Sequence, residues 1–371
     1  MKPVDTSRPR RKSVVFCWNT ISGYMAACWR VMAQREEVDL FVVATSAGTN
    51  SNFSDVLMEG VDCRLLHKEE FLHTHVVRDI VMAHRPDVLV VSGWNNPAYV
   101  RLGFDPIFEN SRRVMAMDNP FRGDWRQHLG RWKLVRYLRR MDTVWVPGER
   151  AWQLARFFGV PEHRVRRGLY GINCRALAPL HTERAALPDG WPKGFLFVGQ
   201  MAIRKGVDLL LEGYADYRRR VVDPWPLCCC GIGPLAPLAA SLPGVQHLGF
   251  VQPAEMLKVF RNCGALAIFS REDAWPVVVV EACAAGLPVL CSDACGSSVE
   301  VVRHLHNGLL VPTGNARGIA DALSWIHMHY PDLPAMGLRS AHLAAAYSAD
   351  TWAERLLAIV GEPRASHLQA N

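Results

Sequence analysis

The sequence predicts an α/β protein built from two doubly wound parallel-sheet domains, and three observations support this. The 371 residues exceed the size at which one hydrophobic core usually stops growing. Half of them are apolar, and short apolar runs alternate with helical periods, as in parallel sheets covered on both faces. The cycle breaks between residues 168 and 193 and restarts at Phe195. We therefore expect one domain over 1–175, a second over 176–350, and a C-terminal helix within 351–371 that crosses back to the first domain.

The first domain begins with an apolar strand at 14–16, a turn at 19–23 and a helix at about 24–33. A strand, a tight turn and a helix in this order open a βαβ unit. Further strands of this domain are expected at 40–44, 87–91, 114–117 and 143–146.

Prolines mark the boundary between the domains. Pro179, Pro188 and Pro192 are expected to interrupt any helix in the boundary segment, because proline lacks an N–H and clashes with the preceding turn. After the boundary a helix is expected from about Val207, and residues 361–371 are expected to fray. The strands of the second domain are expected at 195–198, 226–230, about 247–248, 265–269, 287–291 and 308–311.

Composition limits the class of protein. The eleven cysteines lie in apolar runs without zinc-finger spacing, so we expect reduced core residues. The net charge of +7 suits phosphorylated substrates, an anionic membrane face or nucleic acid. Because the basic residues are scattered rather than gathered in a recognition motif, we expect no nucleic-acid partner. The basic start runs directly into a strand pattern, and no apolar stretch is long enough to span a bilayer, which favours the cytoplasm.

A candidate anion site follows the first strand of the second domain. Arg204 and Lys205 stand in the turn that begins at Gly199, directly before a helix whose first backbone N–H groups are free. Adjacent cations in that position suit a pyrophosphate. A solvated Arg–Lys pair at a turn fits the spacing equally well.

Two further loops follow strands of this domain. Gly231 and Gly233 remove Cβ atoms where backbone can approach a ligand, although Gly-x-Gly-Pro is also an ordinary loop. Val251 ends a short run, begun at Gly249, that is placed to present backbone groups to a base. A plain strand end explains that run as well.

The segment 270–289 carries two acids, Asp273 and Glu281, on either side of an apolar run. A carboxylate beside four valines is costly to bury without a partner. Vicinal ribose hydroxyls would supply one, because an ionised carboxylate accepts two O–H hydrogen bonds. The alternative is that Glu281 caps backbone amides or pairs with a cation such as Arg303.

The second half of the chain resembles the retaining glycosyltransferases of family 4, glycosyl transferase group 1, which have the GT-B fold. The run FVGQMAIRKGVDLLLEGY resembles the donor-phosphate segment of that family, and GIGPL resembles its Gly-rich loop. The run SREDAWPVVVVEACAAGLPVLCSD resembles its acidic E-x7-E signature, and the three runs stand in the family's order. The resemblance implies two Rossmann-like domains that face each other across a cleft.

The resemblance also implies roles for matching residues. Arg204 and Lys205 would hold the donor diphosphate, Asp273 would bind hydroxyls of the transferred sugar, and Glu281 would bind those of the ribose. No metal and no cofactor are implied, and a UDP- or GDP-sugar is expected as co-substrate. The implied donor-binding residues are Gly23, Gly199, Gly231, Gly233, Val251, Ala274, Trp275 and Glu281.

Three residues depart from the family pattern. Asp273 replaces the commoner Glu and shortens the reach by one methylene, and Gln200 replaces a frequent Arg. Pro276 replaces the usual Gly, which removes one N–H beside the amides of Ala274 and Trp275 that would line the sugar-phosphate pocket.

The first domain would supply the acceptor side. Gly23 lies in a loop that family members place near the donor pyrophosphate, and a helix N-cap at Ser22 is compatible with the same residues. Asp118 stands where many relatives carry a His that contacts the transferred sugar, so we expect it in the active site. An Asp that caps a turn is the alternative. Trp94 either stacks on an acceptor ring or packs in the core. The other acceptor-side candidates are Asn95 and Asn119.

A basic and aromatic helix is expected at 131–140. Its side chains suit contact with anionic lipid while a lipid-linked acceptor enters the site. An ordinary amphipathic helix with a solvated cationic face fits the same pattern.

We therefore expect a hexosyltransferase that transfers a sugar from a nucleoside-diphosphate sugar to a hydroxyl of a saccharide, lipid-linked or small-molecule acceptor, with retention of configuration. A GT-B epimerase or phosphorylase would use similar domains. A degenerate nucleotide-binding partner protein is the non-enzymatic alternative. The expected location is the cytoplasm, with a peripheral position at the inner face of the membrane as the alternative.

Overall fold

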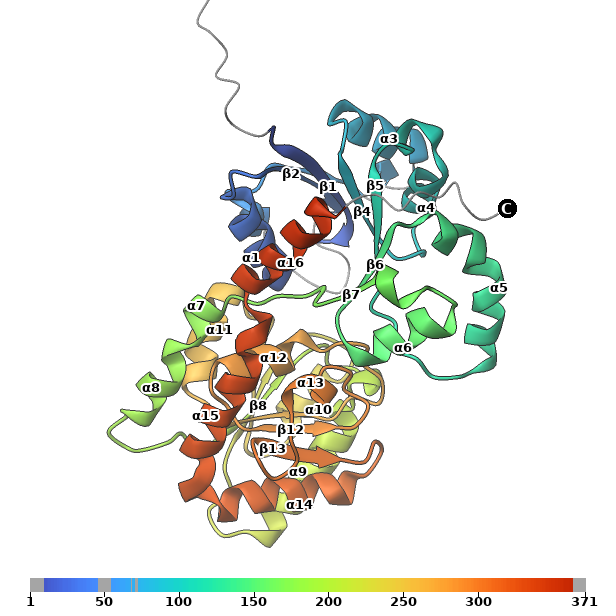
Figure 1. Cartoon of the computed structure of the whole chain (residues 1–371). Coiled ribbons are helices and arrows are strands. Elements are labelled where there is room, and N and C mark those ends of the chain that lie inside the picture. The colour runs from blue at the N-terminus through green and yellow to red at the C-terminus, as the bar shows by residue number, and fades with distance from the viewer. Residues whose placement is uncertain (1–9, 46–54, 68, 71–72, 363–371) are drawn as a thin grey trace, which may run out of the picture. The chain divides into compact units, whose positions relative to one another are not determined.

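The computed structural model describes residues 10–45, 55–67, 69–70 and 73–362, and the chain forms two compact units (Figure 1). Unit 1 extends to Gly171 and resumes at Ala349, while unit 2 runs from Ile172 to Ser348. Each unit is a parallel β-sheet with helices. The predicted pair of doubly wound parallel-sheet domains is therefore confirmed.

Unit 1 is built on a seven-stranded sheet in the order β3-β2-β1-β4-β5-β6-β7. Strand β1 pairs in parallel with both β2 and β4, so the winding direction reverses between β1 and β4. The strands are β1 (Lys12–Thr20), β2 (Val38–Thr45), β3 (Cys63–Leu66), β4 (Val88–Ser92), β5 (Arg112–Ala116), β6 (Thr143–Val146) and β7 (Val165–Arg167). The α-helices are α1 (Gly23–Ala33), α3 (Thr74–Ala83), α4 (Pro97–Phe104), α5 (Trp125–Arg140), α6 (Glu149–Phe157) and α16 (Ala349–Gly361), and the 3-10 helices are η1 (Asp55–Met58), η2 (Pro106–Phe108) and η3 (Glu162–Arg164).

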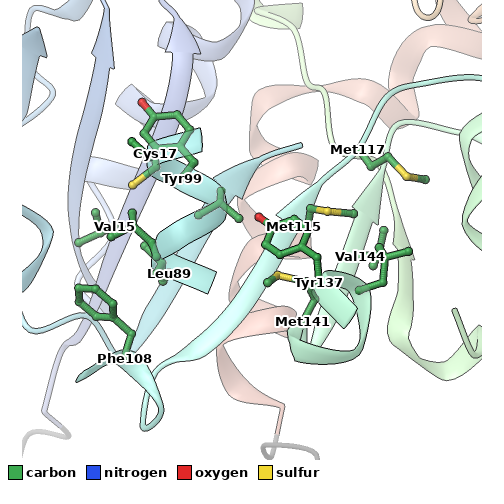
Figure 2. Close-up of a cluster of buried hydrophobic side chains, with 14 of the residues drawn as sticks. Val15, Cys17, Leu89, Tyr99, Phe108, Met115, Met117, Tyr137, Met141 and Val144 are labelled. Carbon is green, nitrogen blue, oxygen red and sulfur yellow. The ribbon is translucent and has the colours of Figure 1, made fainter. Parts of the chain in front are cut away.

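The core of unit 1 lies between this sheet and its helices (Figure 2). Val15 and Cys17 of β1 are two residues apart, so they point to the same face of the sheet, and both are fully buried. The C-terminal helix α16 belongs to this unit. Its Trp352 is fully buried, donates its indole N–H to the carbonyl of Leu169 at 2.7 Å and stacks on Trp145.

Unit 2 is built on a six-stranded sheet in the order β10-β9-β8-β11-β12-β13, and its winding reverses between β8 and β11. The strands are β8 (Phe195–Val198), β9 (Leu227–Cys230), β10 (Val245–Gly249), β11 (Ala265–Ile268), β12 (Val289–Ser292) and β13 (Gly308–Val311). The α-helices are α7 (Cys174–Leu177), α8 (Pro179–Ala185), α9 (Val207–Arg220), α10 (Ala236–Ser241), α11 (Pro253–Arg261), α12 (Val277–Ala284), α13 (Ser298–Val301), α14 (Ala316–Met328) and α15 (Leu333–Ala344), and the 3-10 helices are η4 (Ile203–Lys205), η5 (Tyr330–Asp332) and η6 (Ala345–Tyr347).

The structure confirms every predicted strand, with bounds that shift by a few residues, and adds two. The added strands, β3 and β7, are the edges of the unit 1 sheet, where polar side chains break the apolar pattern. The prolines interrupt the boundary segment as predicted: α7 ends at Leu177, before Pro179, and α8 ends at Ala185, before Pro188. Helix α8 begins at Pro179, a first helical position whose N–H has no intrahelical partner in any case. Of the predicted frayed tail, residues 363–371 lie outside the described residues.

The cysteines are free thiols, as predicted, and eight of the eleven are buried. Arg184 of α8 is a fully buried cation without a carboxylate partner among the described residues. Its guanidinium donates to the carbonyls of Ala285 and Gly286, at 3.0 and 3.2 Å, and to that of Phe260 at 2.5 Å. These carbonyls lie in and just after the last turns of α11 and α12, so Arg184 ties both helix ends to α8.

Candidate functional site

Both sheets place loops at a topological switch point, the position where ligands bind in open α/β sheets. In unit 2 the switch lies between β8 and β11, whose carboxyl ends are neighbours. In unit 1 it lies between β1 and β4.

Lys205 and Asp273 meet at the switch point of unit 2. Lys205 ends η4, which follows β8, and Asp273 lies in the loop that follows β11. The ammonium of Lys205 donates to a carboxylate oxygen of Asp273, and the two side chains are only 16% and 9% exposed. Two of the residues predicted to act on the donor are therefore brought together, although 68 positions separate them.

Arg204 lies beside this pair but is more exposed. Its guanidinium donates to the side chain of Gln200 and to the carbonyl of Glu272, each at 3.3 Å. The backbone N–H of Arg271 donates to the carbonyl of Arg204 at 2.9 Å. Arg204 is thus attached to both loops of the switch point and keeps a charged group near solvent.

Arg271 holds the two loops together, a role that the sequence did not indicate. Its guanidinium binds both carboxylate oxygens of Asp208 in the first turn of α9, at 2.5 and 2.7 Å, and donates to the carbonyl of Ile203 at 2.9 Å. The hydrogen bonds from Arg271 lower the pKa of the Asp208 carboxyl below its usual value. Arg271 therefore positions η4, the segment that carries Lys205.

The predicted Gly-rich loop packs backbone against backbone. A Cβ on Gly231 would lie 1.8 Å from the carbonyl oxygen of Gly199, and one on Gly233 would lie 2.6 Å from that of Met201. Gly231 has φ of +141° and donates its N–H to the carbonyl of Gly249 at 2.7 Å. In this structure the missing Cβ atoms make room for the neighbouring loop, as in the ordinary-loop alternative, and the approach of a ligand to this backbone stays a prediction.

Val251 lies two residues beyond the end of β10 and is half-buried. Strand β10 pairs with β9, so Val251 and the loop after Cys230 belong to the same carboxyl edge of the sheet. That edge is where the sequence placed a contact with the base.

Backbone donors are available before α12. Neither the N–H of Ala274 nor that of Trp275 makes a hydrogen bond within the part of the chain that the structure describes. Pro276 occupies the N-cap of α12 and contributes no N–H, as the sequence indicates. The ring of Trp275 is buried against Tyr347, so this residue offers its backbone rather than its ring. Free N–H groups at a helix N-terminus suit an anion.

Glu281 lies four residues after the first residue of α12, roughly 6 Å along the helix. Its carboxylate has no hydrogen bond or ion pair among the described residues, and Arg303 instead donates to the backbone carbonyls of Val299 and Val302. Desolvation by the surrounding apolar side chains raises the pKa of Glu281 to about 7. The alternative pairing with Arg303 is therefore not present, and the acid is available to a ligand.

The switch point of unit 1 contains a cavity of about 220 Å³. The ends of β1, β4 and β5 contribute to its walls, and so does the segment after β7. Among the described lining residues Asp118 is the only charged one, and no Lys or Arg occurs. The described lining residues are Trp18, Asn19, Thr20, Tyr24, Ser92, Gly93, Asn95, Ala116, Asp118, Asn119, Leu169 and Tyr170.

Asp118 is oriented by Tyr170, which donates its hydroxyl to the carboxylate at 2.9 Å. The ring of Tyr170 lies edge-on to Tyr24 and to Trp18, with centroids 5.3 and 6.5 Å apart. The hydroxyl of Ser92, in the same wall, is buried and has no hydrogen-bond partner among the described residues. The cavity therefore offers a carboxylate acceptor and an unused hydroxyl to a polar ligand.

The other acceptor-side candidates differ in whether they line the cavity. Asn95 and Asn119 line the cavity, as the sequence suggested. Trp94 lies against the core cluster of unit 1, edge-on to Phe158 at 5.9 Å, so its packing alternative describes this structure. Gly23 is the first residue of α1 and does not line the cavity among the described residues.

Ser22 occupies the N-cap position of α1, as the sequence suggested alongside a ligand role for Gly23. Its hydroxyl, however, is buried and makes no capping hydrogen bond. Sequence reasoning also missed Tyr24 and Tyr170 as cavity residues. Tyr24 stood in the loop already singled out, whereas Tyr170 lies in the segment that had been interpreted only as a domain boundary.

The described residues contain neither a cluster of metal ligands nor a helix that could span a membrane. Within the described ranges, no group of three or more His, Cys, Asp or Glu side chains is placed to hold a metal ion. No described helix has both the length and the apolar composition that a bilayer crossing requires.

The fold that carries these two edges is the GT-B fold of glycosyltransferases. Solved structures share this fold with the chain at low sequence identity, so the likeness is one of fold alone. HepE of Anabaena, in complex with UDP and glucose, matches 94% of this chain and 99% of its own with a TM-score of 0.73 and 14% identity. Sucrose-phosphate synthase of Thermosynechococcus elongatus matches 94% and 98% with a TM-score of 0.73 and 15% identity.

Sequence comparison identifies the relatives of unit 2. Residues 183–334 match the family model described as glycosyl transferases group 1. A D-inositol 3-phosphate glycosyltransferase of Nocardia farcinica is 32% identical over 227 residues, 56% of this chain and 50% of that protein. The D-rhamnosyltransferase WbpZ of Pseudomonas aeruginosa is 25% identical over 287 residues, 72% of this chain and 69% of that protein. The chain thus spans about half the length of the Nocardia protein. Unit 2 is therefore related to the glycosyl transferases of group 1.

Proposed function

We propose that the chain is a glycosyltransferase that moves a sugar from a nucleoside-diphosphate sugar to a hydroxyl acceptor. The observation that carries the proposal is the cluster at the switch point of unit 2. There the Lys205–Asp273 pair lies in the same loops as Arg204 and the free N–H groups of Ala274 and Trp275. All of these residues fall within the segment related to the glycosyl transferases of group 1.

The cations suit a departing nucleoside diphosphate. Breaking the bond between the sugar and the phosphate oxygen leaves negative charge on the diphosphate, and fixed donors stabilise that charge in the transition state. Lys205 is little exposed, so its interaction with phosphate is screened less than that of a surface cation. The N–H groups before α12 add donors without a change of charge. Neither of these steps needs a metal ion.

The acids suit the hydroxyls of the donor. Glu281 has no partner among the described residues and accepts O–H hydrogen bonds from the two ribose hydroxyls when it is ionised. Asp273 is held by Lys205 and presents its second oxygen to a hydroxyl of the transferred sugar. The proposed donor is a UDP- or GDP-sugar, with no further cofactor.

The cavity of unit 1 suits the acceptor. Its described walls hold one carboxylate and several neutral polar groups but no cation, which favours a neutral hydroxyl compound over a phosphorylated one. Asp118, oriented by Tyr170, binds the acceptor hydroxyl. We also propose retention of anomeric configuration, on the strength of the motifs in unit 2, and a cytoplasmic location.

The experiment has two stages. Thermal shifts with UDP-, GDP- and ADP-sugars identify the base, because a ligand that binds the folded state raises its apparent stability. Transfer from that donor to a panel of neutral and phosphorylated sugar acceptors is then followed by NMR, which reports the anomeric configuration of the product. The expected result is a glycoside of a neutral acceptor with retained configuration.

Matched variants separate the alternatives. Glu281→Ala is expected to abolish both the thermal shift and transfer, while Lys258→Ala, which changes an exposed lysine of α11, leaves both intact. Interconversion of the free donor without an acceptor would indicate an epimerase, and phosphorolysis of a glycoside would indicate a phosphorylase. Binding of the donor without any turnover would identify a non-catalytic partner protein, and no shift with any nucleotide would reject the proposal.

A further inference from the structure

Helix α5 carries an unusual density of positive charge. Its sixteen residues, WRQHLGRWKLVRYLRR, include six Arg or Lys and no Asp or Glu. The adjacent acid Asp124 is used locally, because its carboxylate accepts the N–H of Gln127 at the N-cap. No charge within the helix therefore offsets the six cations.

The helix has two apolar faces, and only one of them is covered. Tyr137 and Leu138 are buried against unit 1. Trp125, Leu129 and Trp132 are 70%, 45% and 79% exposed. These three stand four and three positions apart, so they form one stripe along the outer side of α5. We call Trp125, Leu129 and Trp132 the outer stripe.

Cations flank the outer stripe on both sides. Consecutive helical residues are about 100° apart, so Arg131 and Lys133 lie on opposite flanks of Trp132. Arg126 follows Trp125 in the same way, and its guanidinium lies 5.6 Å from the centre of that indole ring. An apolar stripe bordered by cations is the pattern of a helix that lies in a membrane interface.

A groove of about 470 Å³ runs beside the stripe. Trp132 forms part of its wall, together with three arginines and apolar side chains. Arg164, which also lines the groove, has an Nε that is buried without a partner among the described residues. The groove thus combines apolar surface with N–H donors for an anionic group. Its described lining residues are Arg131, Trp132, Val135, Leu138, Arg139, Phe158, Gly159, Val160, Pro161 and Arg164.

We propose that the outer stripe and its flanking cations dock unit 1 on the surface of an anionic lipid bilayer. The indole rings enter the headgroup region, where tryptophan is favoured, and the cations neutralise lipid phosphates. The groove receives the headgroup of a lipid next to the helix. Figure 1 shows α5 on the outside of unit 1, away from β1 and β4, whose ends form the cavity.

The stripe favours lipid over nucleic acid. Phosphate contacts from a duplex would use the cations but would leave Trp125, Leu129 and Trp132 in water, because base-pair edges and phosphates offer them little apolar surface. A bilayer buries the stripe and pairs the cations at the same time. The proposal concerns a surface of unit 1 and does not depend on the proposed transfer reaction.

Vesicle co-sedimentation of the full chain tests the proposal. The probes are vesicles of phosphatidylcholine alone and of phosphatidylcholine with roughly 30% phosphatidylglycerol. The expected result is binding to the anionic vesicles only, with a large loss of binding when the salt is raised to about 0.5 M. Trp125→Ala/Trp132→Ala and Arg131→Gln/Lys133→Gln should each lower the partition coefficient by about tenfold or more.

Controls keep the result interpretable. Lys258→Gln/Arg317→Gln removes two exposed cations of unit 2 and should leave binding unchanged. Thermal unfolding of each variant, matched to the wild type, verifies that the fold is intact. Equal binding to neutral and anionic vesicles, wild-type binding by both α5 variants, or complete displacement by duplex DNA at equal charge would overturn the proposal.

Discussion

The two switch-point edges share a topology but differ in charge. In unit 1 the described walls of the cavity contain one carboxylate and no Lys or Arg. In unit 2 the corresponding loops contain Arg204 and Lys205, beside two backbone N–H groups without partners among the described residues. The sheet topology therefore places both candidate edges, and their loops give the two edges different charge. Unit 2 suits a diphosphate, and unit 1 suits neutral hydroxyls.

The edges also differ in what holds them. In unit 2 the Gly-rich loop packs backbone against backbone, with Gly231 against Gly199, and the side chain of Arg271 holds the loops after β8 and β11 together. In unit 1 tyrosine hydroxyls make the contacts: Tyr170 donates to the carboxylate of Asp118, and Tyr99 donates to the carbonyl of Trp18 at 2.8 Å.

Lys205→Met should have the largest effect. The change removes the least exposed cation expected at the departing diphosphate, so kcat for transfer should fall by about 10²- to 10³-fold. Steady-state kinetics with the donor identified by thermal shift measures this. The unfolding temperature should also fall, because Asp273 is left buried without its cation.

A second substitution separates the loss of activity from the loss of stability. Lys205→Met/Asp273→Asn should recover the unfolding temperature but not the activity, since the neutral amide no longer needs a counter-charge. A kcat within about threefold of wild type in Lys205→Met would place the diphosphate elsewhere.

Matched glycine substitutions should distinguish the two modes of loop packing. Gly231→Ala drives a Cβ to 1.8 Å from a backbone oxygen, and the free energy of unfolding should fall by about 3 kcal/mol or more. Gly93 has φ of +59°, and a Cβ there would meet no atom closer than 3.9 Å. Gly93→Ala should therefore lower the free energy of unfolding only by the cost of a left-handed backbone, about 1 kcal/mol. Urea unfolding of both variants provides the measurement. Equal losses would remove the distinction between the edges.

Asp118→Asn should affect the acceptor and spare the nucleotide. Losing a charged hydrogen-bond acceptor costs about 1.5–3 kcal/mol, so kcat/KM for the acceptor should fall by about 10- to 100-fold. Tyr170→Phe removes only the hydrogen bond that orients the carboxylate and should have a smaller effect in the same direction. Calorimetry with the free nucleotide supplies the second readout. A large loss of nucleotide affinity in Asp118→Asn would contradict the separate roles of the two edges.

The sequence predicts the buried parts of the fold better than its edges. Central strands such as β8 and β11 are continuous apolar runs because both faces of a parallel sheet are covered. Edge strand β7 reads VRR and gives no such signal. Pro179 separates α7 from α8 as predicted, but the sequence did not indicate that it would also begin α8, because a residue that breaks a helix interior is well tolerated at a first helical position.

The sequence indicated positions for the candidate site but not the contacts among them. Motif order indicated Lys205 and Asp273, and only the adjacency of β8 and β11 makes their pairing possible. The hydrogen bond between Tyr170 and Asp118 joins residues 52 positions apart, so no local pattern reports it. For Trp94 the sequence allowed either stacking on an acceptor ring or packing in the core, and in this structure its ring packs against the core cluster of unit 1.

The smallest predicted effect concerns pH and Glu281. Burial raises the pKa of this acid from 4.5 to about 7, so the folded protein binds more protons than the unfolded chain between these values. The free energy of unfolding of the unliganded protein should therefore fall as the pH rises through this window. Nucleotide affinity should move in the opposite direction, by about tenfold between pH 6 and 8, because ribose hydroxyls donate to the ionised carboxylate.

Glu281→Gln should flatten both profiles, since an amide does not titrate in this range. Calorimetric titration of the nucleotide and thermal unfolding across pH 5 to 8 measure the two slopes on the same variants. A structural role alone predicts a stability slope without an affinity slope. Opposite slopes that vanish together in Glu281→Gln would tie this half-buried acid to the nucleotide, because only a group that binds the ligand as a carboxylate gains affinity from the ionisation that destabilises its own fold.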